Sequence, residues 1–169
     1  TLNFTGQWQH YDPQSQAPSF WAAMANLGIV NGTRALFSFS IDDTAPGSNA
    51  ANGVYSVSSW WLKLGNYTFG SMSRPYSLSA GGFWGPSTGP TLGGVYRPNF
   101  MQFGLGTTGL PVFGGLSAVS HAPWSNTLLY FDFSSPSARN GGTMLLTQSV
   151  PGPAALPVVL SSLAGLLWL

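Results

Sequence analysis

Charged residues are scarce in this chain. Its 169 residues include five Lys or Arg, four Asp and no Glu, so that 5% of the positions are charged, against about 25% in an average globular domain. A formal net charge of +1 cannot neutralise a run of phosphates, which excludes nucleic acid as a partner. A soluble monomer usually keeps a well-charged surface, so the composition predicts a surface that partners cover.

Cysteine is absent altogether. Its absence excludes disulfide bonds, thiolate metal sites and a cysteine nucleophile. With only His10 and His121 as imidazoles, a metal ion would need mostly oxygen ligands. His10 and Asp12 would share one face of a strand, where a polar strand end is favoured over a ligand site. The sequence predicts no cofactor.

Short segments of alternating apolar and polar residues make up the body of the chain. They are separated by clusters of Gly, Pro, Asn, Asp and Ser, which is typical of an all-β domain. We predict an antiparallel, sandwich-like domain over residues 1–149. Its expected strands include 2–8, 35–41, 54–62, 64–69, 99–105, 128–133 and 143–148.

One segment is expected to be helical. Ser19 would cap a short helix that Gly28 ends. The apolar residues on one side of this helix would be Phe20, Trp21, Met24 and Leu27.

Residues 81–115 contain eleven glycines among bulky aromatic residues. Because Gly and Pro interrupt the hydrogen-bond ladder of a sheet, we expect a long Gly-rich loop that contacts a partner through its aromatic side chains. An irregular series of bulged strands is the alternative, and the sequence favours neither.

The last seventeen residues, 153–169, carry no charge. As an α-helix they would span about 25 Å, slightly less than the ~30 Å hydrocarbon core of a bilayer. We therefore predict a C-terminal membrane-anchor helix over 150–169, with the domain outside the cytoplasmic membrane, on its periplasmic or outer side. A buried core helix and a GPI-type tail are the alternatives. The apolar anchor residues would be Leu156, Val158, Leu160, Leu163, Leu166, Leu167 and Trp168.

Two glycine motifs match known catalytic or cofactor patterns by spacing alone. Residues 104–109 read G-x-G-x-x-G, but the Leu-Pro that follows cannot open the helix that a dinucleotide site needs. Residues 85–89 read G-x-S-x-G around Ser87, but the surrounding loop-like sequence lacks the strand-to-helix turn of a nucleophile elbow. Both are interpreted as turns.

Oxygen-rich side chains cluster after the strand that ends near Asp42. Asp42, Asp43, Asn49 and Asn52 offer hard ligands of the kind that Ca²⁺ prefers, although their spacing does not match an EF-hand. They are weak calcium candidates, and turn formation is the favoured interpretation.

Tryptophan and other aromatic residues are the main candidates for binding. In an alternating strand either Trp60 or Trp61 must point away from the core, and aromatic residues commonly anchor interfaces. The predicted partner-binding residues are Trp60, Trp61, Phe83, Trp84, Tyr96, Phe100, Phe113 and Trp124.

A wider pattern links the loop at Asp42 to the C-terminus. A strand that ends at Asp42 leads into Thr-x-Pro-x-Ser-Asn, followed by a Gly-x-Tyr strand and a hairpin with a glycine turn. This pattern resembles exported bacterial proteins of the PEP-CTERM class. Gly152 stands where that class has Glu, and no Arg cluster follows the apolar run, which favours a retained anchor. The residues that carry the resemblance are 39–49, 53–55, 64–69 and 150–156.

The resemblance implies an extracytoplasmic, β-rich domain. The function expected first is that of a non-catalytic accessory subunit, anchored in the membrane, that docks on a larger cell-envelope complex such as a respiratory or photosynthetic one. The alternative is a protein of the cell surface or biofilm matrix that binds polysaccharide through exposed Trp residues. A hydrolase that uses Ser87 or paired Asp residues is the third and weakest hypothesis.

Overall fold

The computed structural model describes residues 1–12, 16–71, 76–79, 82–105, 127–134 and 140–149. Nine antiparallel strands, one α-helix and one 3-10 turn form within these ranges. The strands are β1 (Leu2–His10), β2 (Arg34–Asp42), β3 (Tyr55–Leu64), β4 (Tyr67–Ser71), β5 (Tyr76–Leu78), β6 (Phe83–Thr88), β7 (Arg97–Leu105), β8 (Thr127–Ser134) and β9 (Asn140–Gln148). The helix α1 spans Pro18–Asn26, and the turn η2 spans Ala50–Asn52.

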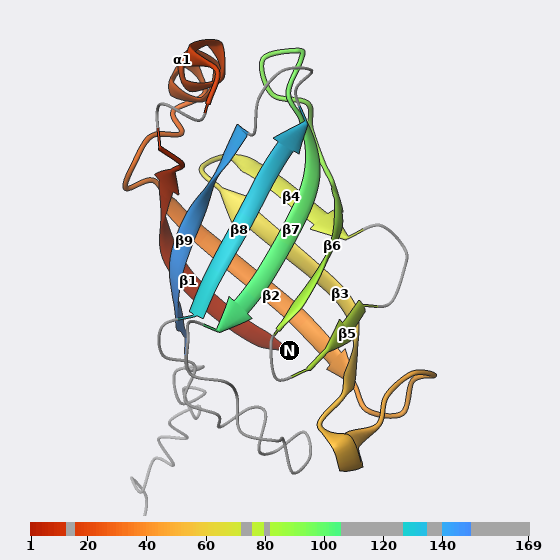
Figure 1. Cartoon of the computed structure of the whole chain (residues 1–169). Helices are drawn as coiled ribbons and strands as arrows, with labels where there is room; N and C mark the ends of the chain where they lie inside the picture. Colours follow the sequence, from red (N-terminus) through yellow and green to blue (C-terminus); the bar gives the residue numbers. More distant parts are fainter. Residues whose placement is uncertain (13–15, 72–75, 80–81, 106–126, 135–139, 150–169) are drawn as a thin grey trace, which may run out of the picture.

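Eight of the strands close into a barrel (Figure 1). Around the barrel the order is β1, β2, β3, β4, β6, β7, β8 and β9, and β9 pairs with β1 to close the ring. The short strand β5 pairs with the beginning of β3, at residues 55–57, whereas β4 pairs with the end of β3, at residues 61–64. The all-β, antiparallel prediction is confirmed, and one closed sheet takes the place of the two stacked sheets of a sandwich.

The interior of the barrel is filled by aromatic side chains. One group consists of Phe4, Phe37, Phe39, Phe83 and Phe103, all at most 1% exposed. The Trp60 ring lies 6.2 Å from Phe37 and 6.5 Å from Phe131, so it joins this group to a second one around Phe69, Phe131 and Phe133. Aromatic rings bury large apolar areas, so this core contributes a large part of the hydrophobic stabilisation of the barrel.

The helix α1 lies at one end of the barrel (Figure 1). Phe20 and Met24 are its buried residues, and the Phe20 ring packs 5.0 Å from Tyr96 and 5.5 Å from Phe133. The helix is confirmed, but Ser19 does not cap it. Ala17 occupies the N-cap without a side-chain bond, and the Ser19 hydroxyl pairs with that of Tyr96 at 2.7 Å.

The glycine-rich stretch contains regular strands. Within 82–105 the chain forms β6 and β7, and the register between β7 and β8 shifts between Pro98 and Phe100. This part therefore follows the bulged-strand alternative rather than the long loop. Residues 106–126 lie outside the described ranges.

The predicted anchor over 150–169 also lies outside the described residues. Within the described ranges, no helix is both long and apolar enough to cross a membrane.

Candidate functional site

Five outward-facing side chains form a row across one side of the barrel. Direct strand pairing places Trp84 beside Gln102, Gln102 beside Tyr130, Tyr130 beside Thr143, and Thr143 beside Gln9. Neighbouring strands lie about 4.8 Å apart, so this cross-strand row spans roughly 19 Å over β6, β7, β8, β9 and β1. Aromatic and amide side chains alternate along its first part.

Each member of the row is held by a buried neighbour in its own strand. The five buried neighbours, each at most 1% exposed, are Phe83, Phe103, Phe131, Met144 and Trp8. Because successive side chains of a strand point to opposite faces, burial of these five residues fixes the outward direction of their neighbours. The row is therefore attached to the rigid core rather than to loops.

Trp84 is the most exposed of the large hydrophobic side chains in the described residues, with 67% of its surface accessible. Its ring centroid lies 5.9 Å from that of Phe100 on β7, with the two planes 33° apart. Phe100 is only partly exposed and supports the indole from one side. Tryptophan is among the residues that most often anchor a binding surface.

A carboxylate and a phenol lie next to the row. The Tyr11 hydroxyl donates a hydrogen bond of 2.5 Å to Asp132 Oδ1. Asp132 follows Phe131 on β8 and lies opposite Phe100 of β7. This bond holds Tyr11 against the same side of the barrel and widens the polar part of the surface.

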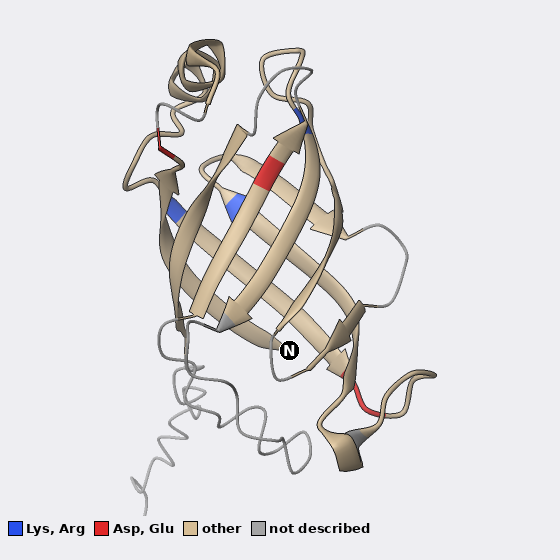
Figure 2. Ribbon diagram, in the orientation of Figure 1, with Lys and Arg blue, Asp and Glu red and all other residues tan. Residues whose placement is uncertain are grey.

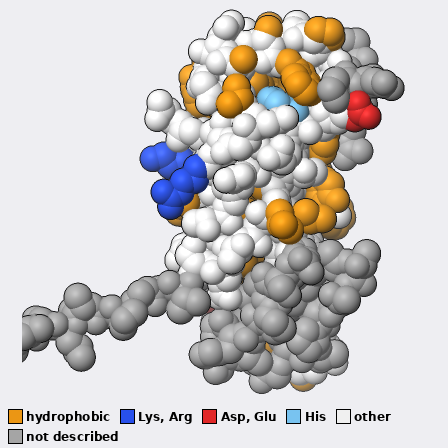
Figure 3. Space-filling model, turned by 90° about the vertical axis from the view of Figure 1, so that its left-hand side faces the viewer, with side chains coloured by type: hydrophobic (Ala, Val, Ile, Leu, Met, Phe, Trp, Pro, Cys, Tyr) orange, Lys and Arg blue, Asp and Glu red, His pale blue; other side chains and the backbone are white. Residues whose placement is uncertain are grey.

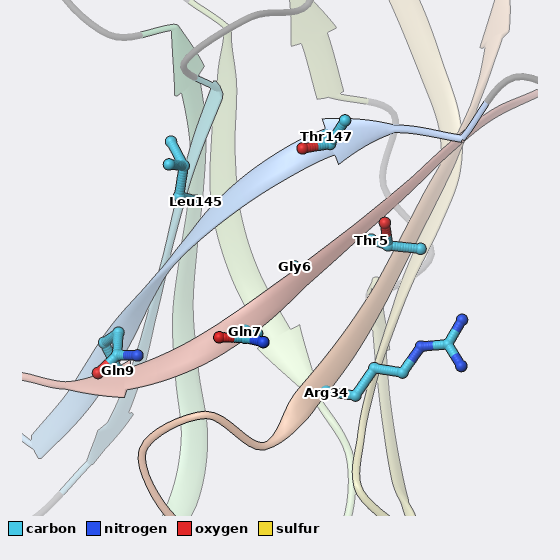
Figure 4. A pocket seen from close by; sticks show the side chains of 7 residues that line it. All are labelled: Thr5, Gly6, Gln7, Gln9, Arg34, Leu145 and Thr147. Atoms are coloured by element: carbon cyan, nitrogen blue, oxygen red, sulfur yellow. The ribbon is translucent and has the colours of Figure 1, made fainter.

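At its β1 end the row enters an open groove of about 550 Å³ (Figure 4). Leu145 is 58% exposed and forms its apolar side. We call this the β1 groove. Its lining residues are Thr5, Gly6, Gln7, Gln9, Arg34, Leu145 and Thr147.

The close approach of β1 to β9 in this groove requires glycine at position 6. A Cβ at Gly6 would lie 2.6 Å from the Leu145 carbonyl oxygen and 2.8 Å from Leu146 Cδ2. Both distances are too short for carbon in contact, so only glycine lets β1 approach β9 this closely.

The predicted partner-binding residues divide into two groups. Trp60, Phe83 and Tyr96 are 2%, 1% and 7% exposed, so they are core residues with little surface to offer a partner. Trp84, Phe100 and Trp61 face outward, and Trp61 is 41% exposed. Phe113 and Trp124 lie outside the described residues.

The calcium candidates take part in the loop after β2. Asp42 Oδ1 accepts hydrogen bonds from the Thr44 hydroxyl at 2.7 Å and from its backbone N–H at 2.9 Å. These bonds hold the pKa of Asp42 below its ordinary value. Asn49 forms a backbone bridge with Val54, and Asp43 is exposed to solvent in the loop that follows β2. In the described part of the chain no three His, Cys, Asp or Glu side chains gather as metal ligands would.

His10 lies at the end of the barrel near α1. Its ring stacks on Trp21 at 4.6 Å, and its Nδ1 accepts a bond of 3.3 Å from Trp8 Nε1. Burial lowers the pKa of His10, and a backbone hydrogen bond with Ile29 offsets part of this effect. The ring therefore belongs to the packing between β1 and α1.

Ser87, the serine of the G-x-S-x-G motif, points into the barrel from β6. It is 6% exposed, and its Oγ has no hydrogen-bond partner among the described residues. It sits in a strand rather than in the turn that a nucleophile elbow requires. The structure thus offers no support for Ser87 as a nucleophile.

The replacement Ser87→Ala is expected to raise the free energy of unfolding by about 1 kcal/mol, because a buried hydroxyl without a partner costs about 1–3 kcal/mol. Chemical denaturation of the two proteins measures this difference. Ser48→Ala is the matched control, since the Ser48 hydroxyl donates to the Asp42 carbonyl at 2.6 Å and accepts from the Ser56 N–H at 2.9 Å. This control should lose stability, and an equal loss for Ser87→Ala would contradict the prediction.

Sequence reasoning missed the amide and hydroxyl members of the row, Gln102, Tyr130, Thr143 and Gln9, as well as Arg34 in the groove. Alternation with buried neighbours is the signal that places Gln102 and Tyr130 on the outside of their strands. The order and register of the strands were needed to bring them together. Comparisons of the chain with protein-family models, with curated proteins and with solved structures give no match.

Proposed function

We propose that this protein is a non-catalytic module of the cell surface or extracellular matrix that binds polysaccharide across the outside of its barrel. The cross-strand row is the observation that carries the proposal. Sugar rings have one apolar face and a rim of hydroxyls, so they suit a surface on which aromatic rings and hydrogen-bonding amides alternate.

The chemistry of each member of the row matches that requirement. The exposed Trp84 ring, supported by Phe100, offers a flat apolar face. Gln102 and Gln9 are exposed, and each amide both donates and accepts hydrogen bonds. Tyr130 adds a second, partly exposed ring two strands from Trp84, at about 10 Å. This separation suits an extended chain of sugars that runs across the strands.

The geometry favours the outside of the barrel over its interior. The interior is occupied by the aromatic core, whereas the row and the β1 groove form a continuous outer surface. Docking on a membrane complex is supported less well, because three of the six candidate residues within the described ranges are buried in the core. The buried position of Ser87 speaks against the hydrolase hypothesis that depends on this serine.

Affinity electrophoresis of the full chain tests the proposal, with a soluble neutral β-glucan or a soluble polyuronate in the gel. Loss of an anchoring Trp at a binding surface costs about 2 kcal/mol or more, so Trp84→Ala should weaken binding about thirtyfold. Trp61→Ala is the matched control, because Trp61 is also exposed but belongs to β3, outside the row.

The two variants separate the outcomes. Retardation of the wild type that Trp84→Ala abolishes and Trp61→Ala preserves supports the proposal. If neither polymer retards the wild type, or if both variants weaken binding equally, the proposal is overturned. Docking on a protein complex would then be the better explanation of the exposed Trp84.

A further inference from the structure

The few basic residues of this protein are not spread evenly. Of the three that the structure describes, Arg34 and Lys63 line one groove of about 290 Å³ between β2 and β3, which we call the β2–β3 groove. Arg97 lies elsewhere, at the start of β7. Figure 2 shows how sparse the charged residues are along the ribbon, and Figure 3 shows one patch of basic side chains on the face that it presents.

Arg34 and Lys63 face the same side of adjacent strands. Lys63 pairs with Leu36, and Arg34 precedes Leu36 by two residues on the same outer face. Like charges at such diagonal positions repel each other. Both side chains are exposed, and neither forms an ion pair or a side-chain hydrogen bond with another described residue.

No carboxylate balances the two cations within the grooves. The residues that line the β1 groove and the β2–β3 groove include neither Asp nor Glu. Only 5% of the residues in this chain are charged. Two neighbouring cations without a carboxylate between them are therefore an unusual local accumulation of positive charge. An anionic group bound between them would relieve their repulsion.

Arg34 also joins these cations to the cross-strand row. It lines both grooves, and it lies directly opposite Gln7 of β1. Gln7 and Gln9 share the outer face of β1 and both line the β1 groove. A polymer that crosses the row from Trp84 and leaves it at Gln9 therefore reaches the Arg34 guanidinium next.

We infer that the polysaccharide bound by this surface is acidic, and that Arg34 and Lys63 bind the carboxylates of its uronic acid units. This inference rests on the proposed function and specifies the class of its ligand. A guanidinium matches a carboxylate with two parallel hydrogen bonds, and an ammonium adds a compact point charge. The row binds the sugar rings, and the two cations select the charged polymer.

A comparison of a polyuronate with the same polymer after reduction of its carboxyl groups tests the inference. The wild-type full chain should bind the polyuronate about tenfold more tightly, since an exposed charge pair contributes up to about fivefold for each cation. Added salt should reduce this preference, because exposed charges are screened.

Variants assign the preference to the two cations. The double replacement Arg34→Gln and Lys63→Gln should bind both polymers equally, at the affinity of the wild type for the reduced polymer. Arg97→Gln removes the same charge outside both grooves and should keep the preference. Trp84→Ala should weaken binding of both polymers.

Each outcome has a separate meaning. Equal binding of the two polymers by the wild type overturns the inference and leaves the proposed function standing. An equal loss of preference in Arg97→Gln also overturns it, because general electrostatic attraction would then explain the effect. Binding of neither polymer refutes the proposed function itself.

Discussion

Replacing Phe103 by alanine is expected to lower the free energy of unfolding by about 3–5 kcal/mol, as is usual for a buried aromatic residue. Phe103 has no accessible surface and lies at the centre of the first aromatic group. Its ring centroid is 5.0–5.4 Å from those of four other rings. Removing the ring would therefore leave a cavity where side chains from several strands of the barrel meet. Few neighbouring groups can move to fill this cavity.

Denaturant unfolding followed by Trp fluorescence measures this loss. Phe100→Ala is the matched control, since Phe100 belongs to the same strand but faces outward and is partly exposed. We expect it to cost about 1 kcal/mol or less, as for most surface changes. Equal losses for the two variants would mean that Phe103 is not a core residue.

Gly85→Ala is expected to lower the free energy of unfolding by up to about 3 kcal/mol, the upper part of the range for overpacked cores. A Cβ at Gly85 would overlap the ring of Tyr76. That ring is 7% exposed, and its hydroxyl donates a hydrogen bond of 2.8 Å to the Pro86 carbonyl. Burial and this bond keep the ring from moving aside.

A double-mutant cycle tests whether the Tyr76 ring causes the loss. In a Tyr76→Ala background the space next to Gly85 is empty, so Gly85→Ala should then cost less than about 1 kcal/mol. The two replacements touch each other, and contacting residues are expected to be non-additive. Additive losses would show that Gly85 is needed for its backbone and not for the space beside it.

A glycine also lies close to a buried aromatic ring where β9 pairs with β1. A Cβ at Gly142 would lie 2.5 Å from Cζ2 of Trp8, and Trp8 is completely buried. At Gly85 and Gly142 glycine therefore has a packing explanation, because a large buried ring occupies the space that a side chain would need.

Much of the fold could be predicted from local patterns. The segment around Phe37 and Phe39 and the one around Phe131 and Phe133 alternate apolar and polar residues, and both form strands whose apolar side chains are buried. The tight connection after Lys63 was predicted as well, and Gly65 there has a φ of 58°. The sequence did not predict which of Trp60 and Trp61 points outward. Adjacent residues of a strand point to opposite faces, and both of these residues are tryptophan.

The candidate site was predicted less well than the strands. Trp84 and Phe100 were identified as contact residues because aromatic side chains anchor interfaces. Phe83 and Tyr96 were chosen by the same criterion and are buried, since residue type does not reveal which face of a strand lies inside. The sequence did not indicate Gln9 or Arg34 as binding residues. A single amide or guanidinium indicates a site only when the residues beside it in space are known.

The sequence by itself determined the class of structure and the two faces of most strands, because alternation with a period of two residues is a local property. Only the tertiary structure decided that the sheet closes, since that depends on β1 pairing with β9 at positions such as Phe4 and Gln148, far apart in the chain. The same pairing places Gln9 at the end of a row that begins at Trp84. Register across strands is set by the packing of the whole barrel. The sequence shows that charged residues are few, but only the tertiary structure shows that two of them, Arg34 and Lys63, line one groove.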